Sequence, residues 1–308
     1  MKPGLLMLPS AVSDSRVHNI LPNKIETDFQ FSRASAATRV NHQGLIEDVG
    51  YFSPELVQNG DFSELGPELI VNGDFATDSD WSLGTGWSIS NGKLRADNVS
   101  LVNAFQAKIY TSGKTYKVTY TISDYVKGQV RFQLGGGGST VNGETRGANG
   151  TYTEYVVATN NHTSARFRGL STDGGFTGSI DNVSVKQVDP NNYWTLGTGW
   201  SIEDGVAISD GSQTGNSGLI QNSVFESGKN YILKFDLTSN GQVIKFWVNG
   251  SQNIFSSALA SGSYKYEFTT TVSGSAYFEA TVNFVGTLSN VSVVEVLGDK
   301  PRLDYDPT

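Results

Sequence analysis

Trp247 stands in the segment QVIKFWVNG, where residues would point alternately to two sides if the segment is a β-strand. Ile244, Phe246 and Val248 then face a core, while Trp247 and Lys245 face the other side. An indole ring turned away from a core can stack on the C–H face of a pyranose. Trp247 and Lys245 are therefore candidate glycan-binding residues. The alternative is that neighbouring elements cover this side of the sheet.

An earlier segment, QVRFQLGG, follows the same alternation. Val130, Phe132 and Leu134 are expected to face inward, with Arg131 and Gln133 outward. The outward positions thus differ between the two segments, which suits two different ligands. Arg131 and Gln133 are included among the candidate glycan-binding residues.

Two acidic residues form a candidate calcium site. Asp74 belongs to NGDF and Asp181 to IDNVSV, which open and close one stretch of chain. Because the first and last strands of a sandwich often lie side by side, these carboxylates are expected to supply oxygen ligands to a structural Ca²⁺. The alternative is turn chemistry, since Asp side chains bond nearby backbone groups.

The sequence gives little support for catalysis or for a metal site other than the calcium site. The chain has no cysteine, which excludes disulfides and thiolate metal sites, and its three histidines disfavour a zinc cluster. A glycan-cleaving enzyme would need two carboxylates about 5–10 Å apart. The available acidic residues Glu144, Asp173, Asp210 and Glu279 lie in no recognisable motif. We therefore expect no enzymatic activity and no cofactor other than calcium.

Charge and hydropathy narrow the class of partner. A net charge of −8 argues against a surface that tracks nucleic-acid phosphates. No apolar run approaches the roughly 20 residues of a membrane span. The leading MKPGLLMLPSA is interrupted by Pro3 and Pro9, so no cleaved signal peptide is expected.

Three blocks of sequence occur twice in the same order. DWSLGTGWSI returns as YWTLGTGWSI, SGKTYKV as SGKNYIL, and DNVSV as SNVSV. The spacing between blocks differs slightly, as insertions in loops would cause. The chain is therefore expected to contain two homologous domains at 67–189 and 190–297. The tryptophans of the first block either cap the two cores or form sugar platforms.

The period within each copy is two. Tyr116, Val118, Tyr120 and Ile122 alternate with polar residues, and the second copy repeats the pattern from Tyr231. Glycine-rich turns separate such runs, and no helical pattern lies between them. These features predict an all-β protein with two tandem antiparallel β-sandwich (jelly-roll) domains.

The segment ELVQNGDF at 55–62 nearly copies ELIVNGDF at 68–75. No NGDF lies just ahead of the second copy. We interpret 51–66 as a linker that contains a vestigial domain opening.

The NGDF opening with its tryptophan and the closing IDNVSV strand resemble the jelly-roll carbohydrate-binding modules of the galactose-binding-like class, over most of 67–297. The resemblance implies a glycan-binding or interaction domain with structural calcium near the edge strands and without catalysis.

The two ends of the chain resemble another family. FQFSRASAATRVNHQGLIEDV at 29–49 and DKPRLDYDP at 299–307 are similar to the N-terminal segment of bacteriophage fibre and spike proteins, and GLLMLPSAVSDSRVHNILP is similar to the start of phage head spike fibres. In that family the two halves lie within a few residues of each other. The sandwiches therefore look like an insertion between them. The residues that match this family's pattern are Phe29, Phe31, Arg33, Ser35, Ala37, Thr38, Val40, Asn41, Gly44, Leu45, Ile46, Glu47, Pro301, Arg302, Asp304 and Tyr305.

This resemblance implies an extended virion-attachment arm at 1–50, to which a C-terminal segment at 298–308 returns. The strand-like QFSRASAATRV is expected to pair with KPRLDY or with neighbouring chains. The candidate attachment residues are Phe29, Phe31, Arg33, Arg39, Asn41, Pro301, Arg302 and Tyr305.

The expected function is that of a structural protein on the surface of a phage particle, a head or tail fibre or spike. Its sandwiches would bind host glycans or decorate the particle. Its partners would be other virion proteins and its own copies, most simply as a trimer, without nucleic acid or a membrane span. The alternatives are a glycan-degrading tailspike enzyme and a surface adhesin unrelated to phage. The position on capsid or tail is left open.

Overall fold

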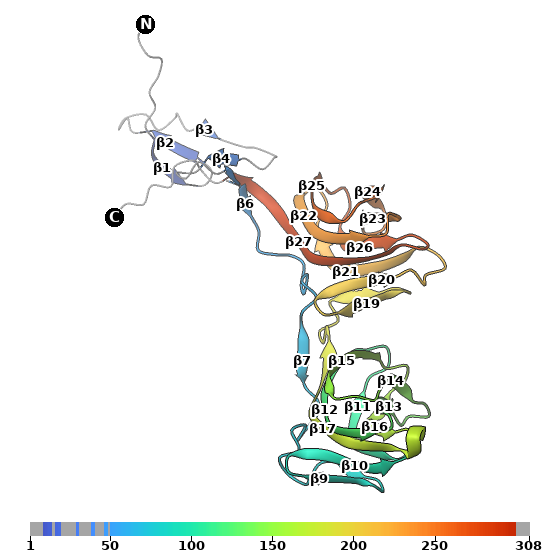
Figure 1. Ribbon diagram of the computed structural model, residues 1–308. Helices are drawn as coiled ribbons and strands as arrows, with labels where there is room; N and C mark the ends of the chain where they lie inside the picture. Colours follow the sequence, from blue (N-terminus) through green and yellow to red (C-terminus); the bar gives the residue numbers. More distant parts are fainter. Residues whose placement is uncertain are drawn as a thin grey trace. The chain divides into compact units, whose positions relative to one another are not determined.

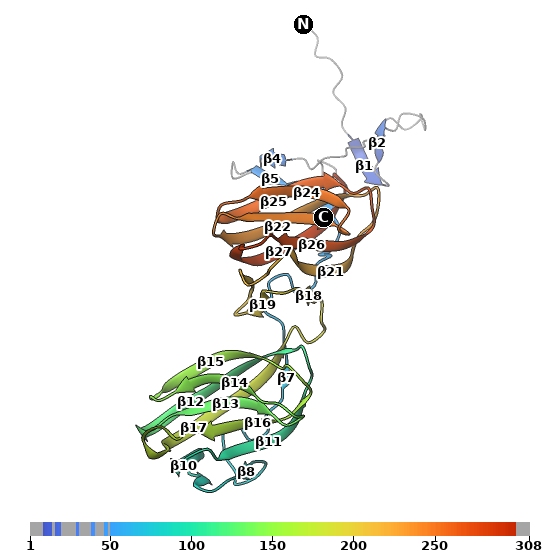
Figure 2. The ribbon, with the colours of Figure 1, turned by 90° about the vertical axis from the view of Figure 1, so that its right-hand side faces the viewer.

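The computed structural model describes residues 9–13, 16–19, 29–30, 38–40, 46–48 and 50–299, with side chains for 52–297. Almost every element in these ranges is a strand, and the helical exception is the short turn η1 (Thr172–Gly174). No helix among the described residues is long and apolar enough to cross a membrane. Two antiparallel β-sandwiches account for 50–299, which confirms the predicted all-β class (Figures 1 and 2).

The first sandwich has two sheets, each described here in spatial order. One contains β15 (Gly150–Val157), β12 (Thr115–Lys127), β17 (Phe176–Val188), β10 (Lys93–Val99) and β9 (Trp87–Ser90), with β7 (Leu65–Glu68) paired to β17. The other contains β14 (Val141–Arg146), β13 (Val130–Gly135), β16 (His162–Gly169), β11 (Asn103–Tyr110) and β8 (Ser82–Leu83).

The second sandwich repeats this arrangement strand for strand. One sheet contains β19 (Trp200–Glu203), β20 (Val206–Asp210), β27 (Val285–Asp299), β22 (Asn230–Ser239) and β25 (Gly262–Thr269), with β6 (Gly50–Phe52) paired to β27. The other contains β24 (Gln252–Ala258), β23 (Val243–Val248), β26 (Gly274–Ala280), β21 (Ser217–Phe225) and β18 (Trp194–Leu196).

The alternation predicted from sequence builds both cores. Tyr116, Val118, Tyr120 and Ile122 on β12 are all buried, as the period of two requires. Aromatic pairs centre each core: Phe132 meets Phe167 with ring centroids 5.7 Å apart, and Phe246 meets Phe278 at 4.7 Å. Both pairs are edge-to-face, a favoured geometry for buried rings. The paired positions also align the two sandwiches residue by residue.

Residues 53–60 form part of the second sandwich, so the prediction that 51–66 is a linker is wrong there. The chain divides into two compact units interrupted in sequence, with residues 50–60 grouped with residues 209–299. Gly60 lies so close to the end strand that a Cβ on it would meet the Val291 carbonyl oxygen at 1.9 Å. Gly73 meets the Val183 oxygen in the same way, at 2.0 Å.

The contacts of 55–62 with the second sandwich repeat those of 68–75 with the first. Glu55 Oε1 accepts the Val293 N–H at 2.7 Å, and Glu68 Oε1 accepts that of Val185 at 2.8 Å. A buried glutamine then holds each segment by both backbone groups. Gln221 bonds the N–H and C=O of Gln58 at 2.7 and 2.8 Å, and Gln106 bonds those of Val71 at 2.9 and 2.8 Å.

The aromatic ends of the two openings also match. Phe62 contacts Trp194 with centroids 5.2 Å apart, and Phe75 contacts Trp81 at the same separation. The NGDF of 59–62 is therefore the missing opening of the second copy rather than a vestige. The second sandwich is discontinuous, with the first sandwich inserted between its opening and the rest.

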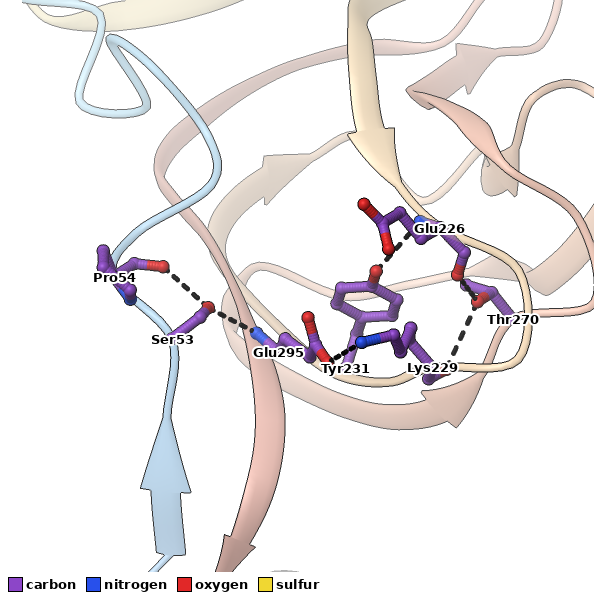
Figure 3. Close-up of polar contacts among 7 residues, drawn as sticks. All are labelled: Ser53, Pro54, Glu226, Lys229, Tyr231, Thr270 and Glu295. Carbon is purple, nitrogen blue, oxygen red and sulfur yellow. Dashed lines mark hydrogen bonds and ion pairs between the residues drawn. The ribbon is translucent and has the colours of Figure 1, made fainter.

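Figure 3 shows how the start of this opening is attached. The Ser53 hydroxyl accepts the backbone N–H of Glu295 at 2.9 Å, and the Glu295 carboxylate lies 2.8 Å from Lys229 Nζ. In the loop that contains Lys229, the N–H of Glu226 is bonded to the Tyr231 hydroxyl at 2.9 Å. Ser53 is thus bonded to β27, and Glu295 of β27 is in turn paired with Lys229 in the loop that precedes β22.

Before residue 50 the structure describes short strands. β1 (Pro9–Ser13), β2 (Arg16–Asn19) and β3 (Phe29–Gln30) form one antiparallel sheet, and β4 (Thr38–Val40) pairs with β5 (Ile46–Asp48). Within QFSRASAATRV, Gln30 belongs to β3 and Thr38–Val40 form β4, and the residues between them lie outside the described ones, so the strand over this segment stays a prediction. The tail KPRLDY lies outside the described residues.

Candidate glycan-binding face

Trp247 faces outward, as the sequence predicts. Ile244, Phe246 and Val248 are completely buried, while Lys245 and Trp247 are partly exposed on the other side of β23. Because β23 pairs with β26, Trp247 lies directly opposite Tyr277, and Lys245 lies opposite Glu279. An aromatic pair and a charged pair thus stand side by side on one face of the sheet.

Glu279 organises the polar half of this face. Its Oε1 lies 2.6 Å from Lys245 Nζ and accepts the Asn216 amide at 2.7 Å, while its Oε2 accepts the Tyr277 hydroxyl at 3.1 Å. The Lys245 ammonium also lies 5.9 Å from the centre of the Trp247 ring. Such a network holds its side chains in one arrangement before any ligand arrives.

The environment of Tyr277 changes its acidity. Burial, followed by the charge and the hydrogen bond of the Glu279 carboxylate, together raise the pKa of the Tyr277 hydroxyl to about 12. The hydroxyl therefore stays neutral at physiological pH. Across the strand, Trp247 Nε1 is buried with no hydrogen-bond partner among the described residues.

The first sandwich presents different chemistry at the same four positions. Register places Arg131 opposite Arg168 and Gln133 opposite Arg166, where the second sandwich has Lys245–Glu279 and Trp247–Tyr277. Arg131 is partly exposed, as expected. Gln133 is on the same face but only 3% exposed, and its amide donates to Asn142 Oδ1 at 2.6 Å.

The candidate calcium ligands lie on neighbouring segments. The Gly73 carbonyl accepts the Val183 N–H at 2.8 Å, so the opening and closing segments meet as predicted. Asp74 Oδ1 bonds the N–H of Ala76 at 3.4 Å, and Asp181 Oδ1 bonds that of Asn182 at 2.6 Å. No group of three acidic or histidine side chains suited to a metal occurs in the part of the chain the structure describes. The calcium site stays a prediction.

The repeated tryptophans belong to the cores. Trp81, Trp87, Trp194 and Trp200 are each 8% exposed or less. Burial of this kind leaves no ring face for a sugar, so their packing interpretation is confirmed.

Most of the predicted attachment residues lie outside the residues that the structure describes. The backbone of Phe29 belongs to β3 and that of Arg39 to β4. The remaining candidates, Phe31, Arg33, Asn41, Pro301, Arg302 and Tyr305, lie outside the described residues.

Sequence reasoning missed four residues of these faces: Tyr277, Asn216, Arg166 and Arg168. The alternation in SAYFEA places Tyr277 and Glu279 on one side of a strand, which was a usable signal. Their position opposite Trp247 and Lys245 depends on strand register, which no local pattern specifies.

The fold and these faces define a protein of two antiparallel sandwiches, each with a polar outer face on the corresponding sheet. No protein-family model and no curated protein matches the chain. Among solved structures, the tandem CBM22 domain of Paenibacillus barcinonensis Xyn10C is 10% identical, with a TM-score of 0.29, over 75% of this chain and 98% of that one. Allantoicase from Saccharomyces cerevisiae is 10% identical, with a TM-score of 0.31, over 78% and 92%. Likeness at this level carries no argument about function.

Proposed function

We propose that this protein is a non-catalytic phage fibre or spike protein whose second sandwich binds a host glycan on the face of Trp247 and Tyr277. The observation that carries the glycan-binding part is the pairing of these two rings beside a prearranged Lys245–Glu279 pair. Rings offer a stacking surface for the apolar face of a sugar, and fixed donors and acceptors bond its hydroxyls. Glu279 here serves as an anchor in a hydrogen-bond network.

The pairing of β6 with β27 supports the virion part of the proposal. Gly50 lies opposite Asp299 in the antiparallel register. Gly50 directly follows the stretch at 29–49, and Asp299 begins the stretch at 299–307. These two stretches together resemble one phage segment. An element inserted into a continuous segment must begin and end close together. Figure 1 shows β6 beside the far end of β27, as such an insertion requires.

Glycan binding is tested with the whole chain on an array of bacterial surface glycans. We expect saturable binding to defined sugars that Trp247→Ala weakens by at least about tenfold, since burial of a large apolar side chain contributes about 1.5–3 kcal/mol. Val126→Ala removes an exposed apolar side chain elsewhere and serves as the control. Addition of EDTA tests calcium in the same assay. Wild-type protein that is folded and binds no glycan would overturn the proposal.

The virion assignment has its own test. Antibodies to the chain should label purified particles of the phage that encodes it in immunogold electron microscopy. Labelling confined to the infected-cell lysate, with clean particles, would refute it. Release of reducing ends from a bound polysaccharide would refute the non-catalytic assignment instead.

A further inference from the structure

The outer face of the sheet β14-β13-β16-β11-β8 carries three arginines close together. Arg131 lies opposite Arg168 across β13 and β16, and Arg166 lies two residues along β16 on the same face. Directly opposed residues have Cβ atoms roughly 5 Å apart, and like charges in such positions destabilise a sheet. No ion pair joins these arginines to a carboxylate within the described residues.

The guanidinium group of Arg166 is held in place rather than free in solvent. Gly135 leaves space for Arg166, because a Cβ there would lie 1.8 Å from the Arg166 Cζ. Arg166 Nη2 donates to Ser164 Oγ at 3.1 Å, and Ser164 in turn donates to the Gly135 carbonyl at 3.2 Å. Burial lowers the pKa of Arg166, and the Arg168 charge lowers it further.

Two hydrogen-bond donors of these arginines have no partner within the described part of the chain. The Nε atoms of Arg131 and Arg166 are both buried and have no hydrogen-bond partner among the described residues. Such buried donors of a charged group are costly without a partner, and because the Arg131, Arg166 and Arg168 side chains are otherwise partly exposed, the cluster can take an anion from outside.

In the second sandwich, the positive charge at the corresponding position is neutralised by a carboxylate. There Glu279 occupies the position of Arg168 and neutralises Lys245 at 2.6 Å. The first sandwich has a cation at both positions and a third at Arg166. The same fold thus presents a balanced charged pair on one copy and an uncompensated positive cluster on the other.

We propose that Arg131, Arg166 and Arg168 bind an acidic saccharide, through a carboxylate or sulfate group on the sugar. This inference rests on the proposed function and names the glycan class of the first sandwich. Guanidinium groups bind such planar or tetrahedral oxyanions through paired, charge-assisted hydrogen bonds. A net charge of −8 over the chain makes a long nucleic-acid phosphate track the less suitable anion.

The test uses the whole chain on an array of uronate-bearing, sialylated and sulfated glycans, each beside its neutral counterpart. We expect at least one acidic glycan to bind at least tenfold more tightly than its neutral counterpart. Arg166→Gln and Arg168→Gln should each weaken this binding about tenfold or more. Arg168→Glu, which places a carboxylate where the second sandwich has one, should abolish it. Lys186→Gln makes the same charge change as the glutamine variants on the other sheet of this sandwich and should have no effect.

Three results would overturn the inference. They are the absence of any preference for acidic glycans, equal binding by the arginine variants and the wild type, and equally tight binding of a DNA duplex probe. Trp247→Ala separates this inference from the proposed function. Neutral glycan binding that is lost in Trp247→Ala, without any acidic preference, would leave the proposed function standing and the arginine site refuted. Circular dichroism checks that each variant is folded.

Discussion

The carbonyl oxygen of Gly60 accepts the backbone N–H of Val291 at 2.8 Å, which joins the second sandwich to a segment that precedes the first. Gly73 and Val183 make the same bond within the first sandwich, also at 2.8 Å. The repeat therefore extends to hydrogen bonds between residues far apart in sequence. Its consequence is that each sandwich has its own NGDF opening, although the two openings are adjacent in the chain.

Substitution of either glycine should destabilise one sandwich and spare the other. A Cβ on Gly60 or Gly73 would collide with a backbone carbonyl, which cannot move as a flexible side chain can. We expect Gly60→Ala and Gly73→Ala each to cost about 2–3 kcal/mol, as overpacking does. Calorimetry should show the two variants lowering different transitions. Gly215→Ala, with nothing within 4 Å of the added Cβ, is the matched control.

The second sandwich should need its upstream opening in order to fold. A fragment of residues 190–299 lacks the opening segment, whose Glu55 accepts the Val293 N–H and whose Gln58 bonds Gln221. Without that segment, backbone groups of β27 lose their hydrogen-bond partners. We expect this fragment to unfold without cooperativity in urea. A permuted chain with residues 50–62 joined ahead of it by a Gly/Ser linker should unfold cooperatively. Equal behaviour of the two chains would contradict the assignment of this segment.

The Tyr277 hydroxyl should make stability depend on pH in the alkaline range. Its pKa is about 12 in the folded protein against about 10 in an unfolded chain. A raised pKa contributes stability that is complete below pH 10 and is lost as the pH rises through 12. Tyr277→Phe should therefore lose less stability between pH 10 and 12 than the wild type does.

Removal of the Glu279 charge should shift the same titration. Because this carboxylate raises the pKa of Tyr277, Glu279→Gln should lower it toward 10. Ultraviolet titration of the phenolate, as a difference from Tyr277→Phe, measures the midpoint. An unchanged midpoint would show that burial alone sets it.

The arginine cluster should reduce the stability of the free protein. Arg131 and Arg168 are directly opposed, and cross-strand pairs of charges contribute roughly 0.2–1 kcal/mol in either direction. Arg168→Glu should accordingly raise the free energy of unfolding by about 1 kcal/mol in low-salt urea denaturation. The gain should shrink at high salt, where such charges are screened. A loss of stability in Arg168→Glu would contradict this prediction, because it would show that Arg168 makes stabilising contacts that outweigh its repulsion from Arg131.

Much of the fold follows from local patterns. Alternation along QVRFQLGG and QVIKFWVNG correctly predicted that Phe132 and Phe246 lie in the cores and that Arg131 and Trp247 face outward. The recurrence of three blocks correctly predicted two sandwiches. These properties depend on a residue and its near neighbours, because a strand turns successive side chains to opposite sides.

The candidate faces needed more than a pattern. The sequence by itself determined that Trp247 and Arg131 point away from their cores, and that the chain contains two similar domains. Only the tertiary structure decided that Trp247 lies opposite Tyr277, that Arg131 lies opposite Arg168, and that the opening at 55–62 belongs to the second sandwich. The reason is physical: register and the choice of partner strand are set by hydrogen bonds and packing between distant segments, whereas the period of a strand is set within the strand.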